Sequence, residues 1–446
     1  MPSRSDIIAA IATAPGRGGV GIIRVSGRNL KAVTAALIGC DLVPRYATYT
    51  PFWGSDKKAI DHGIAIFFPG PNSFTGEDVL ELQGHGGSAI LELVLRRCLE
   101  LGVRMAEPGE FTQRAFLNNK IDLVQAEAIA DLIDATSAQA VRCAQRSLQG
   151  DFSAAINKLV AELIDLRMQI EATLDFPEEA LELADANRYM EKLAKARTGL
   201  KHLFSLSQQG NILREGAHIV LVGLPNVGKS SLLNRLSGED IALVSAIAGT
   251  TRDVIRQAIN IHGVPLHIID TAGLRDSQDI VENMGMARTK LAIQKADMVL
   301  LMVDAQQQER EMYQKILDLI PENIPKIFVI NKIDLLKQEA RVEVQNENSY
   351  IYLSAKNDQG IELLRNKILQ LINWRGEEGA FMARERHLLA LQQASQALER
   401  AATEVGRIEF FAEELRLAQE ALSKITGKFS SDDLLGEIFS RFCIGK

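Results

Sequence analysis

Several features that would assign a class at once are missing from this sequence. Its four cysteines, Cys40, Cys98, Cys143 and Cys443, have neither metal-site nor disulfide spacing, so we expect reduced thiols. No apolar run reaches the length that spans a membrane, and the apolar stretch near the start is too short for a secretory signal. These absences argue against membrane-spanning and disulfide-rich secreted proteins, and they favour a cytoplasmic protein without a membrane partner.

The chain also lacks a net positive charge, an internal repeat and a low-complexity tract. Its formal charge is −7, which argues against a uniformly basic nucleic-acid coat but leaves room for a local basic patch. At 446 residues and 46% hydrophobic composition, the chain is long enough for about three globular domains, each with its own core.

The spacing of apolar residues changes three times along the chain. The first part mixes short β-type runs such as Val20–Val25 with helical stretches, and from Ile121 apolar residues recur at helical spacing. A later region alternates apolar strands with helices, which is typical of a parallel doubly wound sheet, and after it the helical texture returns. We therefore predict a multidomain α+β, helical and α/β protein.

The predicted segments are an N-terminal domain over 1–118, a helical part over 119–213, an α/β domain over 214–374 and a second helical part over 375–446. A helix, α/β, helix order indicates that one domain is inserted into another, because a compact domain with neighbouring ends fits into a loop of its host. We predict one discontinuous helical bundle, and two separate small bundles are the alternative.

One motif in the α/β region indicates a phosphate site. The strand His218–Gly223 runs into Gly223-Leu-Pro-Asn-Val-Gly-Lys-Ser230 and then into a helix, which matches G-x-x-x-x-G-K-[ST] in its required context. The glycines let backbone N–H groups converge on phosphate oxygens. Lys229 is expected to neutralise the β- and γ-phosphates, and Ser230 to bind Mg²⁺.

Two further motifs predict which base is bound. One strand ends in Asn331-Lys-Ile-Asp334 and another in Ser354-Ala-Lys356. Asp334 can accept two hydrogen bonds from N1–H and the exocyclic amine of guanine, which adenine does not supply, while Asn331 and the Ala355 backbone serve the other edge. An unpaired buried carboxylate penalises ATP, so we predict GTP.

The remaining motifs predict hydrolysis. Asp270-Thr-Ala-Gly273 closes a strand, with Asp270 placed to hold Mg²⁺ through water and Gly273 to offer its N–H to the γ-phosphate; a threonine of Gly249-Thr-Thr-Arg-Asp253 completes the metal shell. The next residue is Leu274, where a Ras-like enzyme has a glutamine that orients water. Another group must do this, and the candidates are Glu282, Asp276 and Asp279.

The motif set resembles the bacterial tRNA modification GTPases of the MnmE family, also called TrmE. The resemblance rests on the loop 249–253, the variant at 270–274, the flanking helical segments and the C-terminal Cys443-Ile-Gly-Lys446. The stretches Gly18–Gly27, Pro71–Gly87 and Pro108–Lys120 look like that family too. The resemblance implies an α+β folate-binding N-terminal domain, a discontinuous helical bundle and an inserted P-loop GTPase domain.

The resemblance also implies ligands. Asn226 matches the family's K⁺ ligand, and Ser245, Ile247 and Thr250 complete the K⁺ shell. Thr251 then binds Mg²⁺. Glu282 matches the glutamate that positions water. The implied GTP contacts are Asn226, Val227, Gly228, Lys229, Ser230, Ser231, Ser245, Thr250, Thr251, Asp270, Thr271, Ala272, Gly273, Asn331, Lys332, Asp334, Ser354, Ala355 and Lys356. Residues that match the contacts to 5-formyltetrahydrofolate or a related folate are Arg24, Glu81, Lys120 and Lys446.

The function that the resemblance implies is modification of tRNA. Members of the family form homodimers and act in a heterotetramer with an FAD-dependent partner, MnmG or GidA. They add an aminomethyl or carboxymethylaminomethyl group to carbon 5 of the wobble uridine, with a folate one-carbon donor. Cys443 either acts as a thiolate or only lies on a tail that a helix over 433–442 pins to the bundle through Leu434, Leu435, Ile438, Phe439 and Phe442.

Two other functions stay open at this point. A ribosome-assembly or RNA-binding GTPase switch has similar GTPase motifs but expects an RNA-binding module, which is often basic, and neither flank looks like one. A folate-dependent aminomethyl transferase that merely carries a GTPase domain is the other alternative.

Overall fold

The computed structural model describes residues 6–175, 183–237, 256–270, 290–306, 310–346, 348–376, 379–428, 432–440 and 442–445. The chain divides into two compact units. Unit 1 contains the N-terminal residues up to Ala130, Ile156–Val160 and the chain from Gln419 onward, and unit 2 contains Asp131–Ala155 and Ala161–Ala418. The four-segment boundaries expected from the sequence stay a prediction.

Unit 1 is built on a six-stranded mixed sheet in the order β3-β4-β5-β2-β1-β6, in which only the β1–β6 pair is parallel. Its elements are β1 (Ile8–Ile11), β2 (Gly18–Gly27), α1 (Lys31–Ile38), β3 (Thr48–Trp53), β4 (Ala59–Phe68), β5 (Asp78–Gly86), α2 (Ser88–Glu100), β6 (Arg104–Met105) and α3 (Glu110–Leu117).

The alternation of side chains along β1 gives this sheet two buried faces. Ala9 lies in the core that the sheet shares with α1 and α2, together with Leu37 and Val94. Ile8 and Ala10 point to the opposite face, because successive strand residues alternate, and they pack with Phe111 of α3. The β-type runs read from the sequence are therefore confirmed as the strands of a mixed α+β domain.

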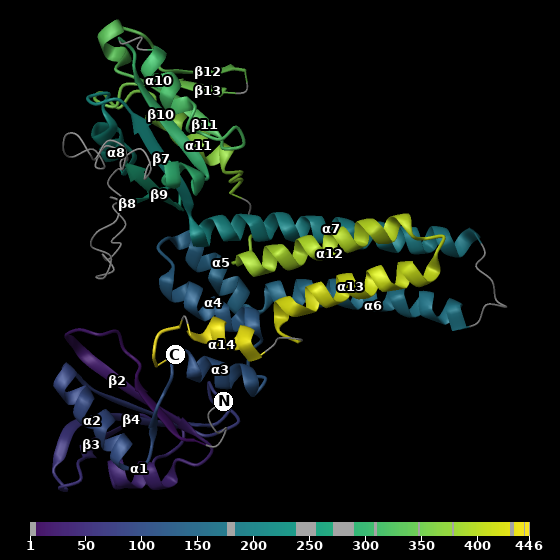
Figure 1. Ribbon diagram of the computed structural model, residues 1–446. Helices are drawn as coiled ribbons and strands as arrows, with labels where there is room; N and C mark the ends of the chain where they lie inside the picture. The colour runs from purple at the N-terminus through teal and green to yellow at the C-terminus, as the bar shows by residue number, and fades with distance from the viewer. Residues whose placement is uncertain are drawn as a thin grey trace. The chain divides into compact units, whose positions relative to one another are not determined.

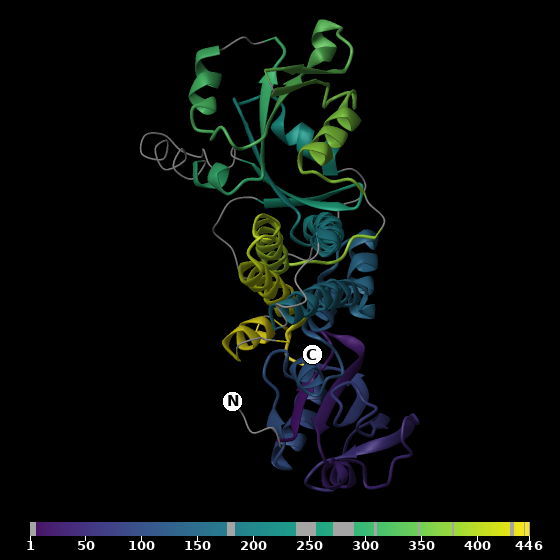
Figure 2. The ribbon, with the colours of Figure 1, turned by 90° about the vertical axis from the view of Figure 1, so that its right-hand side faces the viewer.

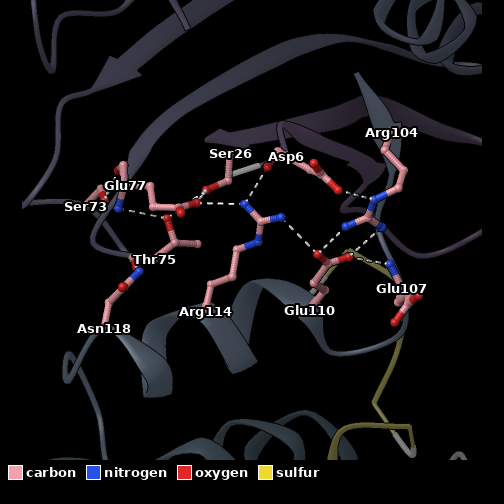
Figure 3. A network of polar contacts seen from close by, with 10 residues as sticks. All are labelled: Asp6, Ser26, Ser73, Thr75, Glu77, Arg104, Glu107, Glu110, Arg114 and Asn118. Carbon is pink, nitrogen blue, oxygen red and sulfur yellow. Dashed lines mark hydrogen bonds and ion pairs between the residues drawn. The ribbon is translucent and has the colours of Figure 1, made fainter. Parts of the chain in front are cut away.

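A buried ion-pair network fastens α3 to the sheet (Figure 3). Arg114 donates to Glu77 at 2.9 Å and to Glu110 at 3.0 Å, and Glu110 also accepts from Arg104 at 2.7 Å. The side chains of Arg114, Glu77 and Glu110 are only 10%, 9% and 5% exposed. Ser26 on β2 donates to Glu77 at 3.3 Å, so the network reaches from the helix to the middle of the sheet.

The charge state of the network follows from competing effects on Glu110. Burial raises the pKa of this carboxyl, but the hydrogen bonds from Arg104, the Glu107 backbone and Arg114 outweigh burial and lower the pKa. Glu110 is therefore ionised at neutral pH, and its contribution to stability is present above its unfolded pKa and is lost as the pH falls through the folded value.

The helices outside the N-terminal and α/β domains come from segments that precede and follow the α/β domain in the sequence. They are α4 (Leu123–Asp134), α5 (Ala138–Gln149), α6 (Asp151–Asp175), α7 (Leu183–Glu215), α12 (Glu385–Thr403), α13 (Ile408–Thr426) and α14 (Asp432–Ser440). In unit 2, α7 packs against α12 although about 170 residues separate them; they lie side by side in Figure 1 and nearly end-on in Figure 2. The prediction of one discontinuous bundle is confirmed.

Within unit 2, both chain connections of the α/β domain lie on the end of α7. Only Gly216 separates α7 from the first strand of that domain. The side chain of Gln209 donates to the Asn373 carbonyl at 2.7 Å and accepts from the Arg375 N–H at 2.8 Å, so it holds the returning chain. The next residue must be glycine, because a Cβ on Gly210 would lie 1.6 Å from the Phe381 carbonyl oxygen.

The α/β domain has a seven-stranded sheet in the order β12-β13-β11-β10-β7-β9-β8, parallel except for the edge strands β8 and β12. Its elements are β7 (Ala217–Gly223), α8 (Lys229–Ser237), β8 (Arg256–Ile261), β9 (Val264–Asp270), β10 (Met298–Asp304), α10 (Arg310–Leu317), β11 (Lys326–Asn331), η3 (Ile333–Leu336), β12 (Arg341–Gln345), β13 (Asn348–Tyr352) and α11 (Ile361–Leu371). The predicted doubly wound class is confirmed.

The C-terminal helix differs from its prediction in length. The expected helix over 433–442 is α14, which ends at Ser440. Leu435, Ile438, Phe439 and Phe442 are buried as expected, and they pack in unit 1 with Leu123, Ala126 and Phe116. The side chain of Leu434 lies outside the described residues. No described helix has both the length and the apolar composition needed to span a bilayer.

The network predicts a large cost for removing its central cation. Arg114→Met leaves Glu77 and Glu110 buried beside one fewer positive charge, and we expect the local free energy of opening to fall by about 3 kcal/mol. Hydrogen exchange of the full chain, followed by mass spectrometry in peptides covering α3, measures this change.

The matched control is the exposed pair Arg96–Glu92 on α2, whose side chains are 62% and 69% exposed. Arg96→Met should change protection by less than about 0.5 kcal/mol. Similar protection in the Arg114→Met protein and the unaltered chain would contradict the stabilising role of the network.

Candidate functional site

The predicted nucleotide motifs lie at one edge of the α/β sheet. β7, β11 and β13 are parallel, and the segments that follow them carry the residues 223–230, 331–334 and 354–356. Because the carboxyl ends of parallel strands meet at the same edge, segments more than 100 residues apart in sequence come together there. This edge is where an open α/β sheet binds its ligand.

The phosphate loop has the backbone shape that its sequence predicts. Asn226 and Gly228 have φ values of 62° and 99°, and α8 begins at Lys229. A Cβ on Gly228 would lie 2.4 Å from the Asn331 amide nitrogen, so only glycine fits. The loop thus runs directly into the N-terminus of α8, where free N–H groups and the helix dipole favour an anion.

The loop also positions its charged and hydroxyl side chains. The Lys229 amine is buried and donates to the carbonyls of Gly223 and Leu224, each at 2.8 Å. Ser230 and Ser231 occupy the first turn of α8, and Val227 is buried beneath the loop. An amine, hydroxyl groups and helix N–H groups are the donors that a nucleotide triphosphate with Mg²⁺ needs, so the residues present fit this ligand.

Asn331 joins the phosphate loop to the predicted base-binding loop. Its amide nitrogen donates to the Val227 carbonyl at 2.8 Å, and its amide oxygen accepts from the Ala355 N–H at 3.0 Å. The sequence predicts that the Ala355 backbone serves the base edge, and in the structure its N–H donates to Asn331. The side chain of Asn331 thereby connects the phosphate loop to the loop that the sequence predicts to read the base.

The predicted base reader Asp334 is held by a neighbouring loop. Ser354 donates its hydroxyl to Asp334 Oδ1 at 2.6 Å and accepts from the Asn357 N–H at 3.3 Å. Lys332 donates to Asp304 at 2.7 Å, and Lys356 follows Ala355 in the same loop. The structure therefore brings the described members of all three motifs together.

Other predicted residues fall outside the described part of the chain. They are Ser245, Ile247, Thr250, Thr251, Thr271, Ala272, Gly273 and Glu282, with the alternatives Asp276 and Asp279. Asp270 ends β9 as predicted, but its side chain is not among those described. The roles of these residues in metal binding and hydrolysis stay predictions.

In unit 1, two of the predicted folate residues contact each other. Arg24 on β2 donates through Nε and Nη2 to Glu81 on β5, at 3.0 and 2.8 Å, because these residues pair directly across the sheet. The strand alternation predicted for Glu81 is confirmed, since Leu80 and Leu82 are buried on the other face. The Arg24 guanidinium also lies 5.9 Å from the centre of the Phe74 ring.

The other two predicted folate residues are placed differently. Lys120 donates to the Pro71 carbonyl at 3.0 Å, so it lies against the loop that precedes β5. Lys446 lies outside the described residues. A carboxylate, cationic groups and a half-exposed aromatic ring suit a pterin with an anionic tail, so the described residues fit this class of ligand.

The C-terminal tail reaches this part of unit 1. Ile444 forms a bridge with Pro108, the Gly109 N–H donates to the Cys443 carbonyl at 3.4 Å, and Arg24 donates to the Gly445 carbonyl at 3.4 Å. The tail is therefore held by these contacts as well as by the buried residues of the preceding helix, and Gly445, two residues after Cys443, lies against Arg24.

The four cysteines differ in reactivity. Burial raises the pKa of Cys98 and of Cys143 to about 12, so neither forms a thiolate at neutral pH. Cys443 and Cys40 are exposed, and all four are free. Among the described residues, no cluster of three or more His, Cys, Asp or Glu side chains is arranged to hold a metal.

Two contacts of these sites were not predicted from the sequence. Phe74 lies in the stretch Pro71–Gly87 that carries the resemblance, which is a usable signal for its place beside Arg24. Arg235 on α8 contacts the Ala355 and Lys356 carbonyls, and no motif marks it.

Family models match nearly the whole chain. A model described as the MnmE helical domain matches residues 123–443, and a model of the N-terminus of the GTP-binding protein TrmE matches residues 7–120. A tRNA modification GTPase MnmE of Nitrosomonas europaea is 56% identical over 448 residues, covering 99% of both chains. Its counterpart in Laribacter hongkongensis is 57% identical over 449 residues, again covering 99% of both.

A solved structure of Aquifex aeolicus Era with GDP and aluminium fluoride is 27% identical and covers 41% of this chain and 66% of that one, with a TM-score of 0.28. A score this low carries no argument about function.

The geometry of the phosphate loop generates a prediction for Gly228→Ala. The added Cβ meets the Asn331 amide at a left-handed backbone position, so we expect GDP affinity to fall at least about tenfold. Isothermal titration calorimetry with GDP and Mg²⁺ measures the loss. Gly406→Ala is the control, since nothing lies within 4 Å of a Cβ there, and it should bind normally. Normal affinity in Gly228→Ala would refute the proposed packing of Asn331 on the loop.

Proposed function

The chain belongs to the MnmE family of tRNA modification GTPases, and we propose that it is a K⁺-stimulated homodimeric GTPase whose hydrolysis drives modification of the wobble uridine. With an FAD-dependent MnmG partner, it adds an aminomethyl or carboxymethylaminomethyl group to carbon 5, using a folate one-carbon donor. Membership of this family removes the basis for the ribosome-assembly alternative.

The observation that carries the proposal is the joined arrangement of Asn331, Asp334 and Ser354. Asn331 bonds both loops of the site, and Ser354 holds the Asp334 carboxylate at 2.6 Å. A carboxylate fixed in this way accepts from N1–H and the 2-amino group of guanine, and adenine supplies neither of these two donors. A site that selects GTP supports the proposal that this chain hydrolyses GTP, as the family does.

Several residues are proposed to act on the phosphates. Lys229 binds the β- and γ-phosphates, while Ser230 and Thr251 hold Mg²⁺, which supplies charge neutralisation when bound. Asn226, Ser245, Ile247 and Thr250 hold K⁺ in place of an arginine finger. Asn226 lies in the phosphate loop, shortly before α8 begins at Lys229, and its φ of 62° is a left-handed conformation that asparagine tolerates. This place on the loop supports the assignment.

We assign positioning of the attacking water to Glu282. Leu274 directly follows Asp270-Thr-Ala-Gly273, and its side chain has no hydrogen-bonding group. Glu282 is the acidic residue that matches the family's catalytic position, while Asp276 and Asp279 are the alternatives. A carboxylate there orients water and accepts its proton.

We place the folate and Cys443 together in unit 1. Arg24, Glu81, Lys120 and Lys446 bind the folate. The described tail contacts support this placement, because the Gly445 carbonyl accepts from Arg24 and the Cys443 carbonyl accepts from the Gly109 N–H. Cys443 is exposed, so as a thiolate it can attack an electrophilic carbon. The competing role, tail positioning, needs only the burial of Phe439 and Phe442.

Replacement of Glu282 tests the link between hydrolysis and modification. Glu282→Ala should lower kcat for GTP hydrolysis by about a hundredfold or more with GTP affinity within about twofold, because the carboxylate acts on water and not on binding. Asp276→Ala and Asp279→Ala are the matched controls and should keep most activity.

The same variants are then expressed in a deletion strain, and tRNA nucleosides are analysed. The unaltered chain should restore the modified wobble uridine, and Glu282→Ala should not. Normal modification by a chain that cannot hydrolyse GTP would favour the transferase that merely carries a GTPase domain.

The choice of monovalent cation tests the K⁺ assignment. At equal ionic strength, GTP turnover in KCl should exceed turnover in NaCl by at least about tenfold, since a cation of the right size offsets charge between the phosphates. Asn226→Ala should remove this difference while GTP still binds. Equal rates in the two salts would eliminate K⁺ from the proposal.

A further inference from the structure

Arg235 lies at the far end of the helix that begins at the phosphate loop. It belongs to α8, and its guanidinium reaches the loop that follows β13. Nε donates to the Ala355 carbonyl at 3.2 Å, and Nη2 donates to the Lys356 carbonyl at 3.1 Å. One planar guanidinium therefore holds two successive carbonyls through two nitrogens, whose directions are fixed relative to each other in a way that the rotatable ammonium of lysine does not reproduce.

The Lys356 carbonyl connects Arg235 to the base reader. That carbonyl and the Asn357 N–H belong to the same rigid planar peptide, so fixing one fixes the other. The Asn357 N–H donates to Ser354 Oγ at 3.3 Å, and Ser354 Oγ donates to Asp334 Oδ1 at 2.6 Å. An unbroken chain of hydrogen bonds thus runs from Arg235 to the Asp334 carboxylate.

The helix end that carries Arg235 is itself held from α11. Arg365 donates to the Arg235 backbone carbonyl at 3.0 Å, and it also pairs with Glu362 at 3.3 Å. Arg235 is therefore anchored at its backbone and bonded at its side chain, both within the α/β domain. Such anchoring matters because an exposed arginine without it loses much of the benefit of its contacts to side-chain disorder.

We propose that Arg235 is a positioning residue for guanine selectivity, which acts through the Lys356–Asn357 peptide and Ser354 to orient the Asp334 carboxylate. The inference rests on the proposed reading of guanine by Asp334. Hydrogen bonds in a chain polarise one another, so a donor at one end strengthens and aligns the bond at the other. Arg235 itself does not touch the nucleotide in this scheme.

Inosine nucleotides separate this role from a merely structural one. Hypoxanthine keeps N1–H and O6 of guanine but lacks the 2-amino group, so GDP gains one more hydrogen bond to Asp334 than IDP does. If Arg235 orients the carboxylate, its loss shrinks the advantage of GDP over IDP. If Arg235 only braces the domain, both nucleotides lose affinity equally.

The experiment measures GDP and IDP binding to the full chain by calorimetry with Mg²⁺. Arg235→Ala should weaken GDP binding by about three- to tenfold and IDP binding by less than about twofold. Arg235→Lys keeps the charge but loses the fixed planar pair of donors, so its loss of GDP affinity should lie between that of the unaltered chain and that of Arg235→Ala. Asn234→Ala, at the exposed neighbouring position of α8, is the matched control and should change neither affinity.

Equal losses for GDP and IDP, or no loss for either, would overturn the proposal. Should Arg235→Ala fail to fold, Arg235→Lys and Arg235→Gln are compared by the same ratio. Asp334→Asn tests separately whether residue 334 reads the base. With an amide at this position, the chain should prefer XDP to GDP. If it does not, the base assignment is wrong regardless of the Arg235 result.

Discussion

The nucleotide site depends on one buried side chain, the amide of Asn331. Its exposure is 3%, and it bonds the Val227 carbonyl on one side and the Ala355 N–H on the other. A buried amide with both ends paired is stable, whereas losing either partner leaves a polar group unsatisfied. The phosphate loop and the base loop are consequently held at a fixed separation, and Gly228 has no room for a side chain.

The topology of the sheet brings together the loops that Asn331 connects. β7, β11 and β13 are parallel and deliver their following loops to one edge, and Asn331 is the last residue of β11. The same strand end carries Asp334 three residues later, where the hydroxyl of Ser354 holds it. The loops that we propose to bind the base and the phosphates are short and lie on a rigid sheet, which keeps their relative positions precise.

The parts of this site that sequence can predict are those in which motif and context are local. The phosphate loop lies between a strand and a helix that both appear in the expected places, and β11 ends at Asn331 as predicted. Arg235 was missed because its partners are 120 residues further along the chain, and only the folded sheet brings them together. The buried Arg114 network was missed for the same reason, since Glu77 and Arg114 belong to different elements. The length of α14 was overestimated because the burial of Phe442 looks the same in a helix and in the tail that follows it.

The central claim is that the end of β11 selects the purine. Calorimetric titration of the full chain with GTP and with ATP, each with Mg²⁺, tests it most directly. The account predicts that GTP binds at least about a thousandfold more tightly, since ATP lacks the two base donors that the Asp334 carboxylate accepts from guanine. Comparable affinities for the two nucleotides would contradict it.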